Sequence, residues 1–268
     1  GNSSRDAESH WIPPWASDPI TGGHHAPSDC SPGKSVLILV PYRQREQHLA
    51  ALLRLPAPDS AAAAALLQHC GWRSSPLPPW LALTEILSYI NEDPRLLRKA
   101  FDSFVALIGV VFHDVDLLPT NPFVPYNCPA YPGTSVCPLT SSATLSPTSS
   151  WGGVLAMPVR HFLKVNGYSN LFWGWGGEDD DMEARIRSVG LLVTRPNPRL
   201  ARYRMIRHQA RKEILNEVRY KLLYLSSKRY RLDGLNSLSY SLVASESRPL
   251  YTHFLIDLGQ PPRSSSFY

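Results

Sequence analysis

The stretch Phe172-Trp-Gly-Trp-Gly-Gly-Glu-Asp-Asp-Asp181 places two tryptophans and three glycines directly before four consecutive carboxylates. Adjacent like charges repel and glycine weakens regular structure, so this pattern does little for stability alone. A sugar site would use all three features. Aromatic rings offer flat contact surface, glycines let the backbone approach closely, and carboxylates accept hydrogen bonds from hydroxyl groups. The alternative is a turn followed by an acidic helix N-terminus, which the helix dipole favours.

A second carboxylate motif ends a short apolar run upstream. Residues 104–112 carry no charge and predict a buried strand, with Gly109 as its weak point. The run ends in His113-Asp-Val-Asp116, and open α/β sheets bind ligands at the carboxyl ends of their strands. Alternation along an extended chain puts both carboxylates on one side, where a metal ion carrying a diphosphate would offset their repulsion. Taken alone, the Asp-x-Asp pattern is also compatible with a solvated strand end.

Together with these motifs, further blocks in the same order resemble the β-1,4-galactosyltransferase family. The similarity covers roughly residues 11–55 and 105–262. The blocks are Val36-Leu-Ile-Leu-Val-Pro-Tyr-Arg-Gln-Arg-Glu-Gln-His-Leu49, Phe112-His-Asp-Val-Asp-Leu-Leu-Pro119, Trp151-Gly-Gly-Val154, Asn166-Gly-Tyr-Ser-Asn170, 172–185, Arg202-Tyr-Arg-Met-Ile-Arg-His208, Asp233-Gly-Leu-Asn-Ser-Leu-Ser-Tyr240, Pro249-Leu-Tyr-Thr252 and Ile256-Asp-Leu-Gly259. The Trp-Gly-Trp-Gly-Gly-Glu-Asp-Asp-Asp block is highly specific to that family.

The resemblance implies an α/β fold of the Rossmann-like, glycosyltransferase-A type, with a mainly parallel sheet, flanking helices and long loops. Residues 1–35 are then expected to form a lumenal stem or entry segment, residues 36–262 a single catalytic domain, and residues 263–268 a tail. Within the catalytic domain, residues 36–150 would form the nucleotide-sugar side. Residues 151–262 would form the acceptor and lid side, with the Trp-Gly-Trp loop as the lid.

The resemblance also implies an inverting, metal-dependent transfer of galactose from UDP-galactose. The implied acceptor is the 4-hydroxyl group of a terminal N-acetylglucosamine or related sugar on a glycan or glycoprotein. The implied metal ligands are Asp116, Met205 and His208, with Mn²⁺ as the cofactor that offsets charge on the leaving diphosphate. Ligand chemistry alone selects Asp116 and His208 and assigns Met205 to the core, because hard cations prefer oxygen to a thioether.

Donor and acceptor contacts follow from the same resemblance. The implied donor contacts are Arg43, Arg45, Asp114, Trp175 and Gly153. The implied acceptor contacts are Gly176, Gly177, Glu178, Asp179 and Asp180. The two arginines follow a strand-like run with a spacing that lets both point the same way, and guanidinium groups bind phosphate through two-point contacts. Asp179 is the implied catalytic base, with Glu178 beside it, because a single displacement needs a carboxylate to take the acceptor proton.

Two segments depart from the family pattern. Residues 56–104 lack the second strand and the Phe-Asn-Arg-Ala motif that contacts uridine, and hold an alanine run and a proline-rich stretch instead. Apolar spacing predicts a helix over residues 81–104, interrupted near Pro94. Residues 139–151 carry serine and threonine where the family places sugar-binding tyrosines. These departures support an alternative: a weakly active or inactive member acting as a glycan- or protein-binding domain. A third candidate is transfer from UDP-N-acetylgalactosamine.

The basic balance of the chain raises a nucleic-acid interpretation. The 268 residues carry a net charge of +5, and the basic residues concentrate between Arg195 and Arg231. No nucleic-acid motif accompanies them, so we predict no nucleic-acid partner. A solvated helix face over residues 209–228 accounts for most of these charges. Its apolar stripe is expected to comprise Ile214, Leu215, Val218, Leu222 and Leu225.

Location and cysteine pairing rest mainly on the resemblance. It implies a type II membrane protein of the Golgi apparatus, and we expect this chain to be the lumenal portion without its signal-anchor. The sequon at Asn2 fits a lumenal glycoprotein. The four cysteines, Cys30, Cys70, Cys128 and Cys137, allow three full pairings. Cys30 and Cys128 match halves of two family disulfides, but Gly109 stands where the partner of Cys128 is expected. A Cys128–Cys137 bridge and free thiols both stay open.

Overall fold

The computed structural model describes the parts of the chain that carry the central sheet, its helices and the acidic motifs. These are residues 35–42, 44–53, 107–120, 124, 126, 134–139, 152–173, 176–197, 201–206, 216–248 and 251–259. The expectations for residues 56–104, for the Ser/Thr-rich segment before Gly152 and for Cys30, Cys70 and Cys128 lie outside them, as does the side chain of Cys137.

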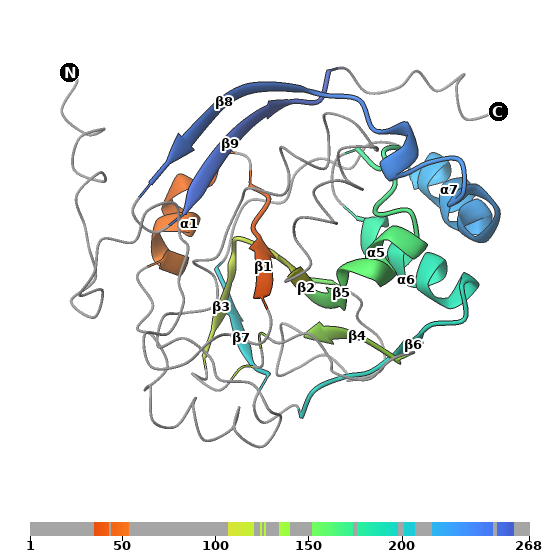
Figure 1. Ribbon diagram of the computed structural model, residues 1–268, viewed down its shortest axis with the longest axis horizontal. Coiled ribbons are helices and arrows are strands. Elements are labelled where there is room, and N and C mark those ends of the chain that lie inside the picture. The colour runs from red at the N-terminus through yellow and green to blue at the C-terminus, as the bar shows by residue number, and fades with distance from the viewer. Residues whose placement is uncertain are drawn as a thin grey trace.

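A five-stranded sheet forms the centre of the described fold (Figure 1). Its strands, in spatial order, are β1 (Ser35–Leu39), β2 (Leu107–His113), β5 (Val154–Pro158), β4 (Thr134–Leu139) and β6 (Leu192–Val193). Strand β1 pairs in parallel with β2, and β4 in parallel with β6, while β5 runs antiparallel to both β2 and β4. Four of these five strands therefore share one direction, which agrees with the predicted, mainly parallel sheet.

The core lies on the apolar strands at the middle of this sheet. Strands β1, β2 and β5 read as nearly uninterrupted apolar runs, as expected for strands covered on both faces. Gly109 lies inside β2, opposite Val36 on one side and Pro158 on the other. The buried core includes Leu37, Ile38, Leu39, Val110, Val111, Val154, Leu155, Ala156, Met157, Phe162, Met182 and Ile186. This packing fixes the end of β2, where the Asp-Val-Asp motif begins.

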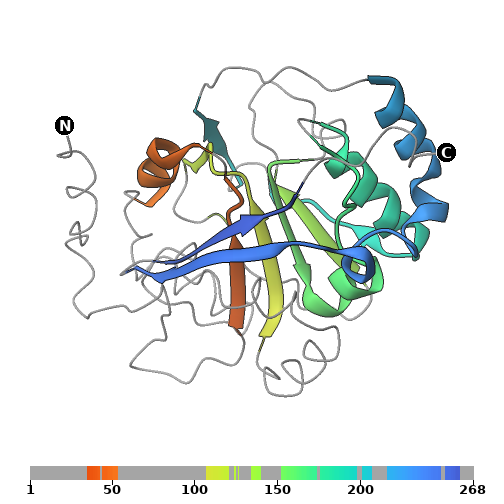
Figure 2. The same cartoon turned by 90° about the horizontal axis from the view of Figure 1, so that it is seen from above.

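Three helices gather beside β5 and β4, and a fourth lies on the other side of the molecule, beside β1 (Figures 1 and 2). The three are α5 (Val159–Lys164), α6 (Glu178–Ser188) and α7 (Asn216–Arg229), and the fourth is α1 (Glu46–Leu53). Helix α6 carries acidic residues in its first turn and basic ones in its last, which suits the helix dipole at both ends. Helix α6 therefore begins at the acidic motif that the sequence singled out.

Two antiparallel strand pairs complete the described fold. Strand β3 (Leu117–Pro119) follows the Asp-Val-Asp motif and pairs with β7 (Tyr203–Met205). Strands β8 (Ser241–Ser247) and β9 (Thr252–Asp257) form a long hairpin, which crosses the sheet over β1 and β2 (Figure 2). A hydrogen bond of 3.0 Å between Tyr42 Oη and His253 Nε2 ties this hairpin to the chain just after β1.

The helix predicted over residues 209–228 is α7, but its face is not simply solvated. Leu222 is buried as expected, whereas Leu225 is 38% exposed. Arg219 and Arg229 instead turn inward, where the Trp173 carbonyl oxygen accepts from Arg219 and the Asp181 carboxylate pairs with Arg229. The prediction of a solvated basic face over residues 209–228 was therefore wrong for Arg219. Arg229, just beyond that range, is turned inward as well. Among the described residues, no helix is both long and apolar enough to cross a membrane.

Candidate active site

The Asp-Val-Asp motif forms a turn at the carboxyl end of β2. The Asp114 amide donates to the Gly153 carbonyl oxygen at 2.7 Å, and the Leu117 amide donates to the Asp114 carbonyl oxygen at 3.1 Å. Because the chain turns here, the strand alternation that we predicted does not apply. Asp114 is exposed whereas Asp116 is 5% exposed, so the expectation that both side chains share one side of an extended chain was wrong.

The buried carboxylate of Asp116 has a basic partner from the first-strand block. Arg45 Nη1 lies 3.0 Å from Asp116 Oδ2, an ion pair that brings together two residues far apart in the sequence. Arg45 directly precedes α1, whose position beside the sheet aims the guanidinium group at the motif. The structure thus joins an implied donor contact to an implied metal ligand. Arg43 lies outside the described residues.

Met205 lies beside Asp116 because β7 pairs with β3. Met205 is opposite Leu117, and the Ile206 amide donates to the Asp116 carbonyl oxygen at 2.8 Å. Its side chain is 53% exposed, which excludes the core role that ligand chemistry alone suggested. His208 lies outside the described residues, and within those residues no three His, Cys, Asp or Glu side chains form a metal-binding group. An accessible thioether on the strand paired next to Asp116 fits the implied donor set.

A buried histidine and a buried tyrosine, His113 and Tyr126, form hydrogen bonds next to the Asp-Val-Asp turn. His113 Nδ1 lies 2.9 Å from the Asp114 carbonyl oxygen, and His113 Nε2 lies 2.8 Å from Tyr126 Oη. A carbonyl only accepts, so Nδ1 carries the proton and Nε2 accepts from the tyrosine. Burial lowers the pKa of His113 to about 4, so the imidazole is neutral at physiological pH. His113 therefore orients the Asp114 backbone through a neutral hydrogen bond.

The N-cap residue of α6, directly before the acidic run, is a glycine that no other residue could replace without strain. Gly177 has φ of +90°, and a Cβ there would lie 2.8 Å from Phe172 Cε1. Glu178 and Asp179 follow as half-buried residues, and Asp180 is exposed. The fourth carboxylate, Asp181, is fully buried and forms an ion pair with Arg229 of α7. Gly174 and Trp175, and with them the predicted lid, lie outside the described residues.

Asp179 lies against the Gly152–Gly153 turn and close to Asp114. A Cβ built on Gly152 would be only 2.5 Å from Asp179 Oδ2, so the carboxylate occupies the space that this glycine leaves open. Burial, followed by repulsion from Glu178, Asp114 and Asp180, raises the pKa of Asp179 to about 8. Asp114 of the first motif and Asp179 of the second therefore lie close enough for their charges to interact.

Tyr168 underlies the same carboxylates. Its ring packs edge-on against Phe112, with centroids 5.1 Å apart. Burial, followed by the negative charges of Asp179, Asp114 and Glu178, raises the pKa of Tyr168 well above its usual value. The phenol consequently stays neutral beneath the carboxylates.

Three residues near the site had no chemical role in the sequence interpretation. Gly152 and Tyr168 belong to blocks that carry the resemblance, so their positions were visible but their contacts were not. Arg219 had no signal, because it stands in a basic helix among other basic residues. In the structure Arg219 Nη2 donates to the Trp173 carbonyl oxygen at 3.2 Å, and its side chain lies beside Gly176 and Gly177.

Two known sequence families match parts of this chain. One family profile, described as the N-terminal region of glycosyl transferase group 7, matches residues 14–58. Another, described as the N-terminal domain of galactosyltransferase, matches residues 140–209. β-1,4-Galactosyltransferase 4 of Cricetulus griseus is 35% identical over 245 residues, which cover 89% of this chain and 67% of the relative. The chain belongs to the β-1,4-galactosyltransferase family. The resemblance inferred from the motifs is thereby confirmed.

Other relatives of this β-1,4-galactosyltransferase family member give the same result. β-1,4-Galactosyltransferase 4 of Homo sapiens is 35% identical over 253 residues, covering 89% of this chain and 67% of the relative. β-1,4-Galactosyltransferase 5 of Danio rerio is 36% identical over 247 residues, covering 89% of this chain and 61% of the relative.

Solved structures confirm the glycosyltransferase-A fold of this family member. The catalytic domain of Drosophila β-1,4-galactosyltransferase 7 in complex with xylobiose superposes with a TM-score of 0.54 and 24% identity. A mutant of that protein in complex with manganese, UDP-Gal and xylobiose gives a TM-score of 0.57 at the same identity. Each comparison covers 85% of this chain and 95% of the other.

Proposed function

We propose that the chain transfers galactose from UDP-galactose to the 4-hydroxyl group of a terminal N-acetylglucosamine or related sugar, with Mn²⁺ as its cofactor. The observation that carries the proposal is the position of Asp179. Its carboxylate lies in the space left by Gly152, and burial and neighbouring carboxylates raise its pKa to about 8. A carboxylate with a pKa near the working pH takes a proton efficiently, which is the task of a general base.

The acceptor side of the proposed site is the first turn of α6. Glu178, Asp179 and Asp180 precede the buried part of that helix, with Gly176 and Gly177 before them. Carboxylates accept hydrogen bonds from sugar hydroxyls, so this turn is suited to orient the attacking 4-hydroxyl group. Asp179 takes the proton from that hydroxyl as its oxygen attacks the anomeric carbon. A single displacement of this kind inverts the anomeric centre.

The donor side lies at the Asp-Val-Asp turn. We assign Asp114 and Gly153 to the donor sugar, and Arg45, with Arg43, to the diphosphate. The guanidinium group of Arg45 already lies beside Asp116. Asp116, Met205 and His208 would hold Mn²⁺, which supplies a Lewis acid for the departing diphosphate. The exposed thioether of Met205 and its pairing position beside Asp116 support this ligand set. Trp175 is assigned to the donor as well.

The manganese and UDP-Gal complex of the Drosophila protein supports the choice of metal and donor, and its xylobiose supports a sugar acceptor. The choice of N-acetylglucosamine rests on the family resemblance, as does placement in the Golgi lumen.

Calorimetry with UDP-galactose, with and without Mn²⁺, tests the donor site. A transfer assay on N-acetylglucosamine, glucose and xylose acceptors then tests the reaction. Binding that requires Mn²⁺, with transfer lost in Asp179→Asn, is the expected result. A folded protein that binds no UDP-galactose would overturn the proposal and favour the inactive, glycan- or protein-binding alternative. Binding of UDP-N-acetylgalactosamine in its place would change the donor but keep the chemistry.

A further inference from the structure

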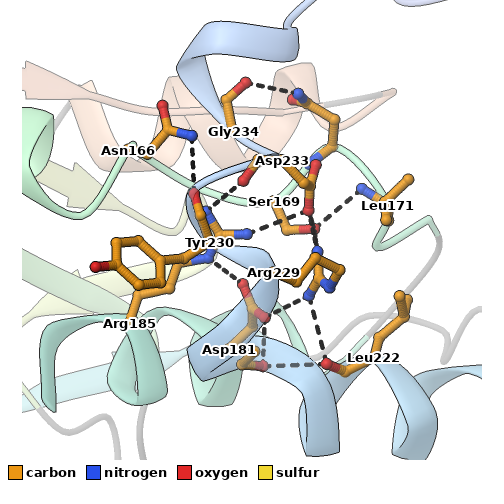
Figure 3. A network of polar contacts seen from close by, with 12 residues as sticks. Asn166, Ser169, Leu171, Asp181, Arg185, Leu222, Arg229, Tyr230, Asp233 and Gly234 are labelled. Carbon is orange, nitrogen blue, oxygen red and sulfur yellow. Dashed lines mark hydrogen bonds and ion pairs between the residues drawn. The ribbon is translucent and has the colours of Figure 1, made fainter. Parts of the chain in front are cut away.

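A buried cluster of charges lies directly behind the acidic turn of α6, outside the residues assigned to substrates. Its members are Asp181 and Arg185 on α6, Arg229 at the end of α7, and Asp233 beyond it (Figure 3). Asp181 and Arg185 are fully buried, and Asp233 is 7% exposed. Two guanidinium groups face two carboxylates, so the cluster is balanced in charge. We call these four residues the charge network.

Arg185 lies at the centre of the charge network, where its guanidinium group contacts two carboxylates and two backbone carbonyl oxygens. Its Nε donates to Asp181 Oδ2 at 2.5 Å, and its Nη2 lies 3.2 Å from Asp233 Oδ2. Its Nη1 donates to the carbonyl oxygens of Gly167 and Asp233, at 3.1 and 2.7 Å. The guanidinium group therefore joins α6 to the loop after α5 and to the segment after α7.

Arg229 closes the network from α7. Its Nη2 lies 2.6 Å from Asp181 Oδ1, and its Nη1 pairs with Asp233 Oδ2. Ser226, one turn earlier on α7, donates to Asp181 Oδ1 at 2.5 Å. The Arg229 guanidinium carbon also lies 5.7 Å from the centre of the Phe172 ring, within range of a cation–π contact. Arg229 thus touches the tryptophan-rich motif as well as the helix that follows it.

The network also holds the segment that leads into this motif. Ser169 Oγ donates to Asp233 Oδ2 at 2.5 Å and accepts from Arg229 Nη1 at 2.8 Å. The Asn170 amide donates to Asp233 Oδ1 at 2.9 Å. The charge network therefore contacts the chain on both sides of the 172–181 motif. Asp233 binds the segment that precedes the motif, and Asp181 lies within the network at the motif's end.

The geometry of α6 links the charge network to the proposed base, Asp179, because Asp179 and Asp181 belong to the same helical turn. Residues two apart on an α-helix point about 200° away from one another. Asp181 consequently faces α7 while Asp179 faces Gly152 on the other side of the same turn. Phe172 contributes a second link, because its ring lies against Gly177, the N-cap residue of α6. A shift of Arg229 would therefore reach the acidic turn from both sides.

We propose that Asp181, Arg185, Arg229 and Asp233 are positioning residues for the acceptor side of the site. They fix the first turn of α6 against the 169–173 segment. Buried charges tolerate few arrangements, because each must keep its partner or lose its solvation without compensation. Because the buried ion pairs allow few alternative arrangements, they hold the first turn of α6 in one position. The inference rests on the proposed function, since the effect on turnover matters only if Asp179 is the base.

The test substitutes Arg229→Gln and compares it with Arg187→Gln. Arg187 lies on α6 and forms an i,i+4 ion pair with Glu183 at 2.6 Å, but its side chain is 65% exposed. The control therefore removes a charge and an ion pair from the same helix without touching the network. Three quantities are measured: kcat and acceptor KM for transfer, binding of UDP-galactose with Mn²⁺, and hydrogen exchange of the α6 amides.

Arg229→Gln should lower kcat by about tenfold or more, since small displacements of catalytic groups are costly, and should raise the acceptor KM. Donor binding should stay within about twofold, because the Arg45–Asp116 ion pair on the donor side shares no residue with the charge network. Amides of residues 181–186 should exchange faster. Arg187→Gln should match the wild type in all three quantities. Unchanged turnover and exchange in Arg229→Gln would overturn the inference, as would equal loss of donor binding and turnover.

If Arg229→Gln does not fold, Arg229→Lys and Ser226→Ala carry the same test with smaller changes. Lysine keeps the charge but cannot bridge two carboxylates with a planar fork. Both variants should then lose turnover while keeping donor binding, and wild-type values in both would overturn the inference. A wild-type chain without donor binding or transfer would refute the proposed function instead. Hydrogen exchange at α6 would in that event still decide whether the network positions the turn.

Discussion

Replacing Gly152 by alanine should disable Asp179 with little effect on the rest of the fold. The new Cβ would lie 2.5 Å from Asp179 Oδ2, and the carboxylate must retreat by about 0.9 Å to reach an ordinary contact of 3.4 Å. It can do so because Oδ2 is the free end of a side chain. A displacement of about 1 Å at a reacting group costs on the order of 10²-fold in rate, so kcat should fall by roughly that factor.

Backbone strain needs its own control, because Gly152 has φ of +142° and alanine is disfavoured there. Gly190 provides it, with φ of +72° and no heavy atom within 4 Å of its built Cβ. Each alanine variant should lose about 1–3 kcal/mol of unfolding free energy from strain, measured by urea denaturation. Only Gly152→Ala should lose turnover in a galactose-transfer assay. Wild-type turnover in a folded Gly152→Ala protein would refute the placement of Asp179 as the base.

Three further substitutions test individual side chains. Asp179→Asn should reduce transfer by about 10²–10⁴-fold while UDP-galactose still binds, and retained turnover would exclude Asp179 as the base. Because the pKa of Asp179 is raised from 3.8 to about 8, its ionisation opposes folding progressively as the pH rises toward 8, so Asp179→Asn should raise the unfolding temperature more at alkaline than at acidic pH in thermal scans. Arg45→Ala removes the 3.0 Å ion pair to Asp116 and should tighten binding of Mn²⁺ alone by up to about fivefold, since partly exposed pairs contribute up to about 1 kcal/mol. Weaker calorimetric binding of Mn²⁺ to this variant would contradict that reasoning. Met205→Ala should weaken Mn²⁺ binding yet change the unfolding free energy by no more than about 0.5 kcal/mol, because its side chain is 53% exposed; unchanged Mn²⁺ affinity would remove Met205 from the ligand set.

Much of the architecture was predictable because its signals are local. The uncharged apolar run before Asp114 predicted β2, which the structure places at Leu107–His113. The acidic run at 178–181 was compatible with a helix N-terminus, and α6 begins at Glu178. Periodicity and charge at a helix end act within a few residues, so they are visible in the chain itself.

Predictions failed where one residue's environment depends on distant segments. Strand alternation predicted that Asp114 and Asp116 share one side of the chain. The chain turns there instead, and Asp116 is buried in an ion pair with Arg45. Arg219 lies on the helix face that we predicted to be solvated, yet it faces inward, and so does Arg229 just beyond that range. A buried carboxylate from another helix offsets the desolvation of Arg229, and no spacing rule within α7 reports that partner.

The sequence by itself determined the family, the glycosyltransferase-A fold and the identity of the acidic motifs. Those properties reside in residue types and their order along the chain. Only the tertiary structure decided that Asp179 lies against Gly152 and beside Asp114, and that Asp181 belongs to a buried charge network instead of the site. Each of these outcomes depends on distance and burial between segments far apart in sequence. Desolvation and Coulomb energy act through space, and therefore appear only once the chain is folded.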